Sequence, residues 1–425
     1  MSLDLFTTLV EPKIYLRGPL HLKKKERESS KAYNHKVACL IVLISLKRKA
    51  VMLNKFKLIW GISVLVSAFS VSAQVKVGVI EGLSGPPAIV DFGESYLQGI
   101  KLALKDYEAK GGKTKIELVV YDDEANPQRA VSLAQRLIQN DKVPVVIGTV
   151  SSGNVLAMAP ILQKAGVPLV AGPSIATNIT TQFINEKPSQ IFRCSMVERF
   201  QIEEMLDWGV KNFKRIGLIH STTGYGNFAA KEIEAILKEK GVELVANEAA
   251  APDVSDLTPQ LVKLKDAKAE LLLNFHESFE LPFRPMARLG YKPVVAGNWG
   301  LSSQKVLEIV GKDAIEGTVM GQALDTDSPR AKSFDARMKA EYAGAYRWPV
   351  LAALGYDAGT IVFKAVDKVG SSNPAAIRDA IEGISGIEAI SATPSKPFSP
   401  TDHECLDKKD VFLGVWKNGT VVKLR

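Results

Sequence analysis

The chain has 425 residues, of which 46% are hydrophobic and 24% are charged. These values are typical of a globular protein with two or three domains, and they exclude a disordered, collagenous or coiled-coil chain. The formal net charge is +8, but residues 1–73 hold 13 Lys+Arg and 4 Asp+Glu out of totals of 54 and 46. The other 352 residues are therefore nearly neutral, with 41 basic and 42 acidic side chains. Because nucleic-acid binding needs a concentrated basic surface, we exclude that class of protein.

Residues 52–73 have the three parts of a secretory signal peptide. Two lysines give a basic start, residues 58–69 form a largely apolar region of twelve residues, and the small Val71 and Ala73 occupy the cleavage positions. A membrane-spanning helix needs about 20 apolar residues, so an anchor is the weaker interpretation of this run.

Residues 1–51 precede a complete signal peptide, and no exported protein needs them. We therefore expect translation to start at Met52 and residues 1–51 to be an upstream extension. Cleavage after Ala73 would leave a soluble protein in the periplasm.

Two cysteines, Cys194 and Cys405, follow the predicted signal peptide. In an oxidising compartment they could form a disulfide, or they could be two unrelated buried thiols. We expect unpaired thiols, and neither cysteine has the CxxC spacing of a redox or zinc site.

Short runs rich in Val and Ile alternate with amphipathic stretches in the first part of this region. We predict strands at 75–80, 116–121, 143–148 and 167–172, with helices around 95–110, 128–139 and 154–165. Asn126 and Pro127 are typical of a helix N-cap followed by its first turn. Continuous apolar strands separated by helices predict a doubly wound parallel sheet that is covered on both faces.

The same alternation restarts after about residue 200. We predict strands at 215–220, 242–246, 270–275 and 292–297, with helices at 198–211, 227–240, 257–267 and 278–289. Further helices follow at 328–345, 350–369 and 374–382, and a hairpin turns at Asn418 and Gly419. The fold class is therefore α/β, with two doubly wound lobes joined by short hinges.

Hydroxyl-rich turns follow two successive strands of the first lobe, at 149–154 and 173–177. Ligands of open α/β sheets bind beyond the carboxyl ends of the strands, where helix N-termini present free N–H groups. Each turn alone could be an ordinary helix cap. Two such turns on successive strands predict a site for a carboxylate.

Seven segments together resemble the type I periplasmic solute-binding proteins of ABC importers, in the branched-chain amino-acid-binding group. They are Ser84-Gly85-Pro86, KGG at 110–112, YDDEANPQRAV at 121–131, VIGTVSSGN at 146–154, Tyr225-Gly226, AALGYDA at 352–358, and the closing DHECLDKKD with GVWKNG. The resemblance implies two Rossmann-like lobes, linked by three hinge crossings, that close on a small solute.

We place the first lobe at 74–197 plus 324–390 and the second at 198–323 plus 391–425. The resemblance also implies a monomer that needs no cofactor or metal, catalyses no reaction, and delivers a small carboxylate to a permease and ATPase in the inner membrane.

The resemblance places the ligand carboxylate on hydroxyl groups of the two turns. These positions match Ser152, with Gly153 beside it, and the segment from Ser174 to Thr177. The aromatic residues that line the family's pocket match Phe92, Tyr225, Phe275 and Tyr346, and His276 could add a polar contact.

Amino-acid-binding members of the family hold the ligand ammonium with two acidic residues. Our alignment places Phe200 and Trp299 at those positions, so we expect the pocket to reject an α-amino acid and accept an aromatic or apolar acid. An alignment shift of one or two residues would instead make Glu198 the missing acid.

Three other interpretations compete with this one. The GxGxxA pattern at 224–229, followed by Glu243, could belong to an NAD-dependent enzyme, but three residues separate the predicted strand from the tight turn that this fingerprint needs. A metal site at His276-Glu277 or at 402–404 lacks the usual ligand spacing. A periplasmic sensor for a receptor would share the fold, and sequence does not separate it from a transport protein.

Overall fold

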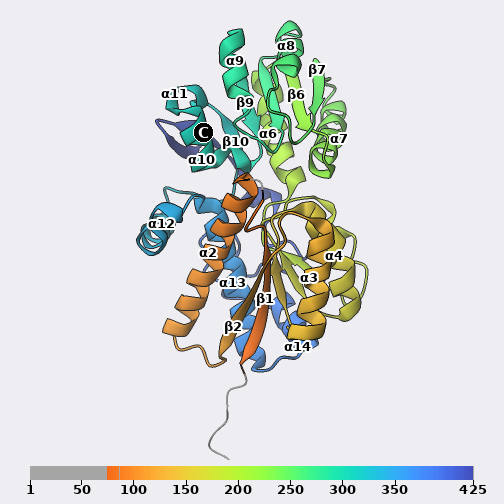
Figure 1. The fold of residues 1–425 in the computed structure, drawn as a ribbon, viewed down its shortest axis with the longest axis vertical. Coiled ribbons are helices and arrows are strands. Elements are labelled where there is room, and N and C mark those ends of the chain that lie inside the picture. Colours follow the sequence, from red (N-terminus) through yellow and green to blue (C-terminus); the bar gives the residue numbers. More distant parts are fainter. Residues whose placement is uncertain (1–73, 86, 425) are drawn as a thin grey trace, which may run out of the picture. The chain divides into compact units, whose positions relative to one another are not determined.

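The computed structural model describes residues 74–85 and 87–424. The predicted signal peptide, its cleavage after Ala73 and the upstream extension lie outside these residues. In the described part, two separate sheets are each flanked by helices (Figure 1). The predicted α/β class is confirmed, and we call each sheet with its helices a lobe.

The first lobe contains a parallel sheet with the strand order β2-β1-β3-β4-β5. Its strands are β1 (Val75–Glu81), β2 (Ile116–Asp122), β3 (Val146–Gly148), β4 (Leu169–Ala171) and β5 (Ile191–Arg193). Its helices are α2 (Pro87–Ala109), α3 (Pro127–Arg136), α4 (Ser152–Ala165) and α5 (Asn178–Thr181), with a π-helical turn at Leu137–Asp141. Asn126 caps α3 as predicted, because its side chain accepts from the amide of Arg129. Helices α3 and α4 cover one face of this sheet (Figure 1).

The second lobe contains a sheet with the strand order β12-β11-β10-β9-β8-β6-β7. Its strands are β6 (Ile216–Ser221), β7 (Ala246–Ala250), β8 (Leu271–Phe275), β9 (Val294–Gly297), β10 (Val319–Gln322), β11 (Phe412–Lys417) and β12 (Thr420–Lys423). Its helices are α6 (Glu198–Asn212), α7 (Gly224–Glu239), α8 (Thr258–Asp266), α9 (Phe283–Leu289), α10 (Gln304–Val310) and α11 (Lys312–Ile315), with a 3-10 turn, η2, at Trp299–Ser302. Strands β6 to β10 run parallel, and β11 and β12 are antiparallel additions.

The late helices return the chain to the first lobe. They are α12 (Pro329–Tyr342), α13 (Pro349–Val369) and α14 (Pro374–Glu382), and α13 packs along α2 on the face of the first sheet opposite α3 and α4 (Figure 1). Because β11 and β12 then rejoin the second sheet, the chain passes between the lobes three times. Helix α13 has the length and hydropathy of a membrane span, but 83% of its apolar window is buried inside the protein, as in a core helix.

The C-terminal hairpin was predicted correctly, and two details of the sheets were not. Asn418 and Gly419 both have positive φ, at 53° and 78°, as a two-residue hairpin turn requires. The short strand β5 carried no clear sequence signal. Strand β7 begins at Ala246 rather than at residue 242, because the amide of Val242 bonds to the carbonyl of Leu237 and so belongs to the end of helix α7.

Candidate functional site

The two predicted hydroxyl turns meet in the structure. Ser152 begins helix α4, and its half-buried Oγ accepts hydrogen bonds from the amides of Ile175 and Ala176 at 3.3 and 3.1 Å. Since the oxygen accepts both bonds, the hydroxyl hydrogen is left to donate to another group. Gly153, next to Ser152, is exposed.

The other two hydroxyls of this region differ in their surroundings. Ser174 is 1% exposed, and its Oγ has no hydrogen-bond partner among the described residues. Thr177 donates to Glu232 of helix α7 at 3.1 Å and accepts from the amide of Arg199 at 3.3 Å. Ser174 therefore has free hydrogen-bonding capacity, whereas Thr177 is occupied by a contact with the second lobe.

A buried arginine holds the 174–177 segment in place through a hydrogen bond to its backbone. The guanidinium of Arg193 donates to the carbonyl of Ala176 at 2.6 Å and makes a bidentate pair with Glu404 at 2.6 and 2.7 Å. Thr180 also donates to Glu404. This network fixes the backbone whose amides reach Ser152. No local sequence pattern predicts this network, because the two charged residues lie 211 positions apart.

Aromatic side chains from both lobes pack against one another. The ring of Phe92 on α2 stacks with Phe279 at 6.2 Å between centroids and meets Trp348 edge-on at 4.0 Å. Of these three rings, the sequence analysis named only Phe92 as a site residue. Phe279 and Trp348 each lie within three residues of another residue that it named, His276 or Tyr346.

The predicted aromatic residues of the second lobe lie near its strand ends. Tyr225 and Phe275 have ring centroids 6.5 Å apart, and the Tyr225 hydroxyl accepts a bond from Asn298. Phe275 and Trp299 are buried, and Phe200 is half-buried against the core. The side chain of Gln201 accepts the backbone amide of Trp299 at 3.2 Å.

An acidic group lies beside Tyr225. Glu198 is 1% exposed, and within the described structure neither of its carboxylate oxygens has a hydrogen-bond partner. Burial raises the pKa of Glu198 well above its usual range, and the nearby charges of Glu232 and Glu277 raise it further. Burial, Glu198 and Glu277 likewise raise the pKa of Tyr225. Glu198 is the acid that the sequence analysis left open as the alternative to Phe200 and Trp299.

His276 is held by the backbone on both sides of its ring. Its Nδ1 accepts from the amide of Ser278 at 3.1 Å, so Nε2 carries the proton and donates to the carbonyl of Ala251 at 3.0 Å. Neither ring nitrogen is left for a ligand. No cluster of His, Cys, Asp and Glu that could hold a metal ion is found in the part of the chain that the structure describes.

The GxGxxA segment lies within the first turns of helix α7, at 224–229. Thr223 caps this helix by accepting from the amide of Gly226 at 3.2 Å, and its hydroxyl donates to Glu277 at 2.5 Å. A carboxylate therefore lies near the helix N-terminus, where a dinucleotide would place its negatively charged pyrophosphate.

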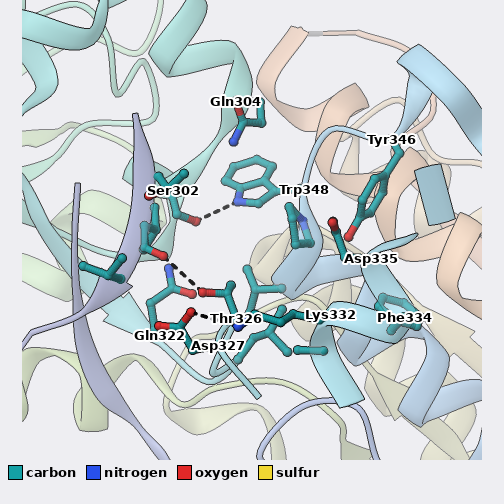
Figure 2. Close-up of a pocket in the computed structure, with 17 residues that line it drawn as sticks. Ser302, Gln304, Gln322, Thr326, Asp327, Lys332, Phe334, Asp335, Tyr346 and Trp348 are labelled. Atoms are coloured by element: carbon teal, nitrogen blue, oxygen red, sulfur yellow. Dashed lines mark hydrogen bonds and ion pairs between the residues drawn. The ribbon is translucent and has the colours of Figure 1, made fainter. Parts of the chain in front are cut away.

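A cavity of about 300 Å³ is lined by residues of the second sheet and of the segments on both sides of helix α12. Ser302, Gln322 and Tyr346 line it together with Trp348 (Figure 2). Of the residues predicted from sequence, only Tyr346 borders this cavity.

The chain is similar to proteins of known class along most of its length. Residues 74–420 match the periplasmic binding protein family. A Leu/Ile/Val-binding protein homologue from Brucella melitensis is 28% identical over 360 residues, which cover 83% of this chain and 94% of that protein.

Two solved structures are similar to this chain over 83% of its length. A periplasmic binding protein type 1 from Bordetella pertussis is 26% identical and fully covered, with a TM-score of 0.73. A solute-binding protein of an ABC transporter from Rhodopseudomonas palustris, in complex with 3,4-dihydroxybenzoic acid, is 25% identical and 96% covered, with a TM-score of 0.68.

Proposed function

The chain belongs to the periplasmic binding protein family, and from this we propose that it captures a small carboxylate between its lobes and delivers it to an ABC importer. The observation that carries the proposal is the junction of Ser152 with the 174–177 segment. It supplies hydroxyl donors at the start of helix α4, where a carboxylate is favoured by the helix dipole as well.

Two serines have hydroxyl groups that can still form a hydrogen bond to a ligand carboxylate, and we call them the anion-binding end of the site. Ser152 can donate its hydroxyl hydrogen, and the buried Ser174 has no partner among the described residues. A buried hydroxyl without a partner is unfavourable, so a ligand oxygen that bonds to Ser174 relieves this penalty. The donors suit a carboxylate, which accepts hydrogen bonds and donates none when it is ionised.

The body of the ligand is proposed to be aromatic or apolar. Phe92, Phe279 and Tyr225 take part in ring contacts in the two lobes, and each aromatic contact contributes roughly 0.5–1.5 kcal/mol beyond the burial of area. The R. palustris relative was solved with a dihydroxybenzoic acid, a compound of this class. Glu198, whose amide bonds to the carbonyl of Ile175 at 2.8 Å, could bond to a hydroxyl group of such a ligand.

An α-amino acid is the competing ligand, because an ammonium group could ionise Glu198 and pair with it. The B. melitensis relative is named as a Leu/Ile/Val-binding protein homologue. The raised pKa of Glu198 favours its neutral acid form and therefore favours a hydroxyl partner.

A thermal-shift screen tests the function and the ligand class together. The protein is heated with aromatic carboxylates, leucine, isoleucine, short dicarboxylates and the matching amides. A ligand at 100 times its Kd stabilises the fold by about 2.7 kcal/mol, which raises the melting temperature measurably. A shift of the melting temperature with aromatic acids and none with leucine would support the proposal. A shift with leucine alone would mean that the ligand is an α-amino acid and not an aromatic acid. No shift with any carboxylate would contradict the proposed function.

The Ser152→Ala variant tests the anion-binding end. We expect the affinity for the best ligand of the screen to fall by about 1.5–3 kcal/mol, because a hydrogen bond to a charged group is lost. Isothermal titration calorimetry measures the change, and Ser132→Ala on the exposed surface of α3 is the control. Unchanged affinity in Ser152→Ala would remove Ser152 from the site.

A further inference from the structure

Cys194 and Cys405 come together where two of the three connections between the lobes run side by side. Cys194 follows strand β5, on the first passage to the second lobe, and Cys405 lies on the third passage, before β11. Both are free thiols in the structure, and they are 0% and 1% exposed.

The backbone holds the two cysteines in register. The amide of Arg193 bonds to the carbonyl of His403 at 2.9 Å, and the amide of Cys405 bonds to the carbonyl of Arg193 at 3.0 Å. This is the pattern of a parallel bridge in which Arg193 pairs with Glu404. One step along the same pairing, Cys194 lies opposite Cys405.

Neighbouring strands of a sheet lie about 4.8 Å apart, which is inside the range of roughly 4.4–6.8 Å between the Cα atoms of disulfide-bonded cysteines. Residues that pair directly also direct their side chains to the same face. The Arg193–Glu404 ion pair lies on one face of this bridge, so the thiols share the other face.

The surroundings of the thiols agree with this placement. The Cys194 thiol faces the carbonyl of Leu354 at 3.8 Å, and the Cys405 sulfur is 3.7 Å from the hydroxyl of Thr393. The neighbouring Cys405 thiol is the main cause that raises the pKa of Cys194, and burial adds to it. Two thiols this close and this buried do not react with solvent once the protein is folded, so any reaction between them must occur before the chain closes over them.

We propose that Cys194 and Cys405 form a disulfide during folding in the periplasm, which ties the first and third connections between the lobes. The oxidant is a disulfide, either of a thiol oxidoreductase or of glutathione. The thiolate of one cysteine attacks this disulfide and releases one donor thiol, leaving a mixed disulfide. The second thiolate then displaces the other donor thiol. Two cysteine thiols lose two electrons and two protons, and the donor disulfide is reduced to two thiols.

The bond would affect the hinge and leave the ligand contacts unchanged. It would join two of the connections across a loop of more than 200 residues, whereas the passage between β10 and α12 stays unlinked. Constraining so long a loop lowers the entropy of the unfolded chain and stabilises the folded protein. The proposal is independent of the ligand class argued above.

Peptide mapping tests the bond directly. The chain is exported in a bacterial host, denatured in N-ethylmaleimide and digested with trypsin without reduction. In parallel, purified protein is refolded with a glutathione redox pair and treated in the same way. Cleavage after Arg193, Arg199, Arg378 and Lys408 yields peptides 194–199 and 379–408. We expect one linked species, two mass units lighter than the sum of the free peptides, that separates after dithiothreitol.

Recovery of both peptides as separate maleimide adducts, in the exported and the refolded protein, would overturn the proposal, as would linkage of either one to another cysteine. Thermal unfolding gives a second measurement. Dithiothreitol should lower the Tm of the native chain by about 5 °C, and it should leave the Cys194→Ser, Cys405→Ser double variant unchanged. Equal responses of the two proteins would contradict a disulfide.

Discussion

At Arg193, a fully buried guanidinium is shared between a carboxylate and a backbone carbonyl. Two of its nitrogens bond to Glu404, and a third bonds to Ala176. Both ends of this network matter for the site, because Ala176 also presents its amide to Ser152. A lysine keeps the charge, but it has no planar fork and cannot make all three contacts at once.

The Arg193→Lys variant should therefore be both less stable and weaker in binding. Disrupting a buried ion pair costs about 3–5 kcal/mol when one partner is lost, so we expect a loss of at least about 2 kcal/mol in urea unfolding. Affinity for the screened carboxylate should fall about tenfold. Arg199→Lys is the matched control, since Arg199 pairs with Glu203 while both side chains stay partly exposed, and the variant should change stability by less than about 0.5 kcal/mol. Equal effects of the two variants would contradict a positioning role for Arg193.

Glu198→Gln should change the pH dependence of stability. Burial raises the pKa of Glu198, so between about pH 4.3 and its folded pKa the folded protein holds a proton that the unfolded chain has lost. Stability from this residue is therefore present at low pH and lost as the pH rises. Glutamine stays neutral, so the variant should match the parent at pH 4.5 and exceed it by at least about 1 kcal/mol at pH 8 in urea unfolding. Glu239→Gln on the exposed face of α7 is the control, and its stability should follow that of the parent at both pH values. If Glu198→Gln instead changes the unfolding free energy equally at pH 4.5 and pH 8, the raised pKa of Glu198 is contradicted.

Helices α2 and α13 approach closely because glycines remove side chains from their contact. A Cβ on Gly355 of α13 would lie 2.1 Å from the carbonyl oxygen of Tyr96, and one on Gly99 of α2 would lie 2.0 Å from that of Ala352. No L-residue fits these positions without moving a helix. Helix α2 carries Phe92 and α13 begins beside Trp348, so the contact between the helices also fixes the positions of these two rings relative to each other.

The Gly355→Ala variant should lose about 1–3 kcal/mol of stability through overpacking, even though alanine favours helix. Gly344→Ala tests the same substitution in an exposed 3-10 turn where a Cβ would meet nothing within 4 Å. That control should stay within about 0.5 kcal/mol of the parent in urea unfolding. A neutral Gly355→Ala would show that the two helices can separate without loss.

The elements also show where sequence reasoning succeeds and where it ends. Apolar runs and caps predicted most strands and helices, and the rule that successive parallel strands end at one edge placed Ser152 near Ser174. The pairing of Gly99 with Gly355 depends on contacts between distant segments, which no local pattern contains. Glu198 and Phe200 lie two positions apart on helix α6 and so point in nearly opposite directions. A shift of two residues in alignment therefore exchanges an acid for an aromatic ring.

Across the whole molecule, the lobes are joined by a buried chain of hydrogen bonds and by pairs nearer the surface. The indole of Trp348, beside α2 in the first lobe, donates to Ser302 of the second lobe at 2.9 Å. Ser302 in turn donates to the carbonyl of Trp299 at 2.6 Å. The Arg347–Glu308 pair also joins the lobes at 2.8 Å, but it is more exposed. If the protein captures solute by closing its lobes, the buried hydrogen bonds should contribute more to the free energy of closure than the exposed ion pair does.

A double-mutant cycle on Trp348→Phe and Ser302→Ala measures this contribution. If closure depends on the bond, each variant should weaken binding of the screened carboxylate by about 1 kcal/mol. The double variant should then lose little more than either single one, which gives a coupling energy of about 1 kcal/mol by calorimetry. The cycle on Arg347→Ala and Glu308→Ala should give less than about 0.5 kcal/mol, because solvent screens an exposed pair. Strictly additive losses of binding free energy at Trp348 and Ser302 would mean that the bond forms equally in the free and the bound protein. The ligand contacts alone would then supply the free energy of closure.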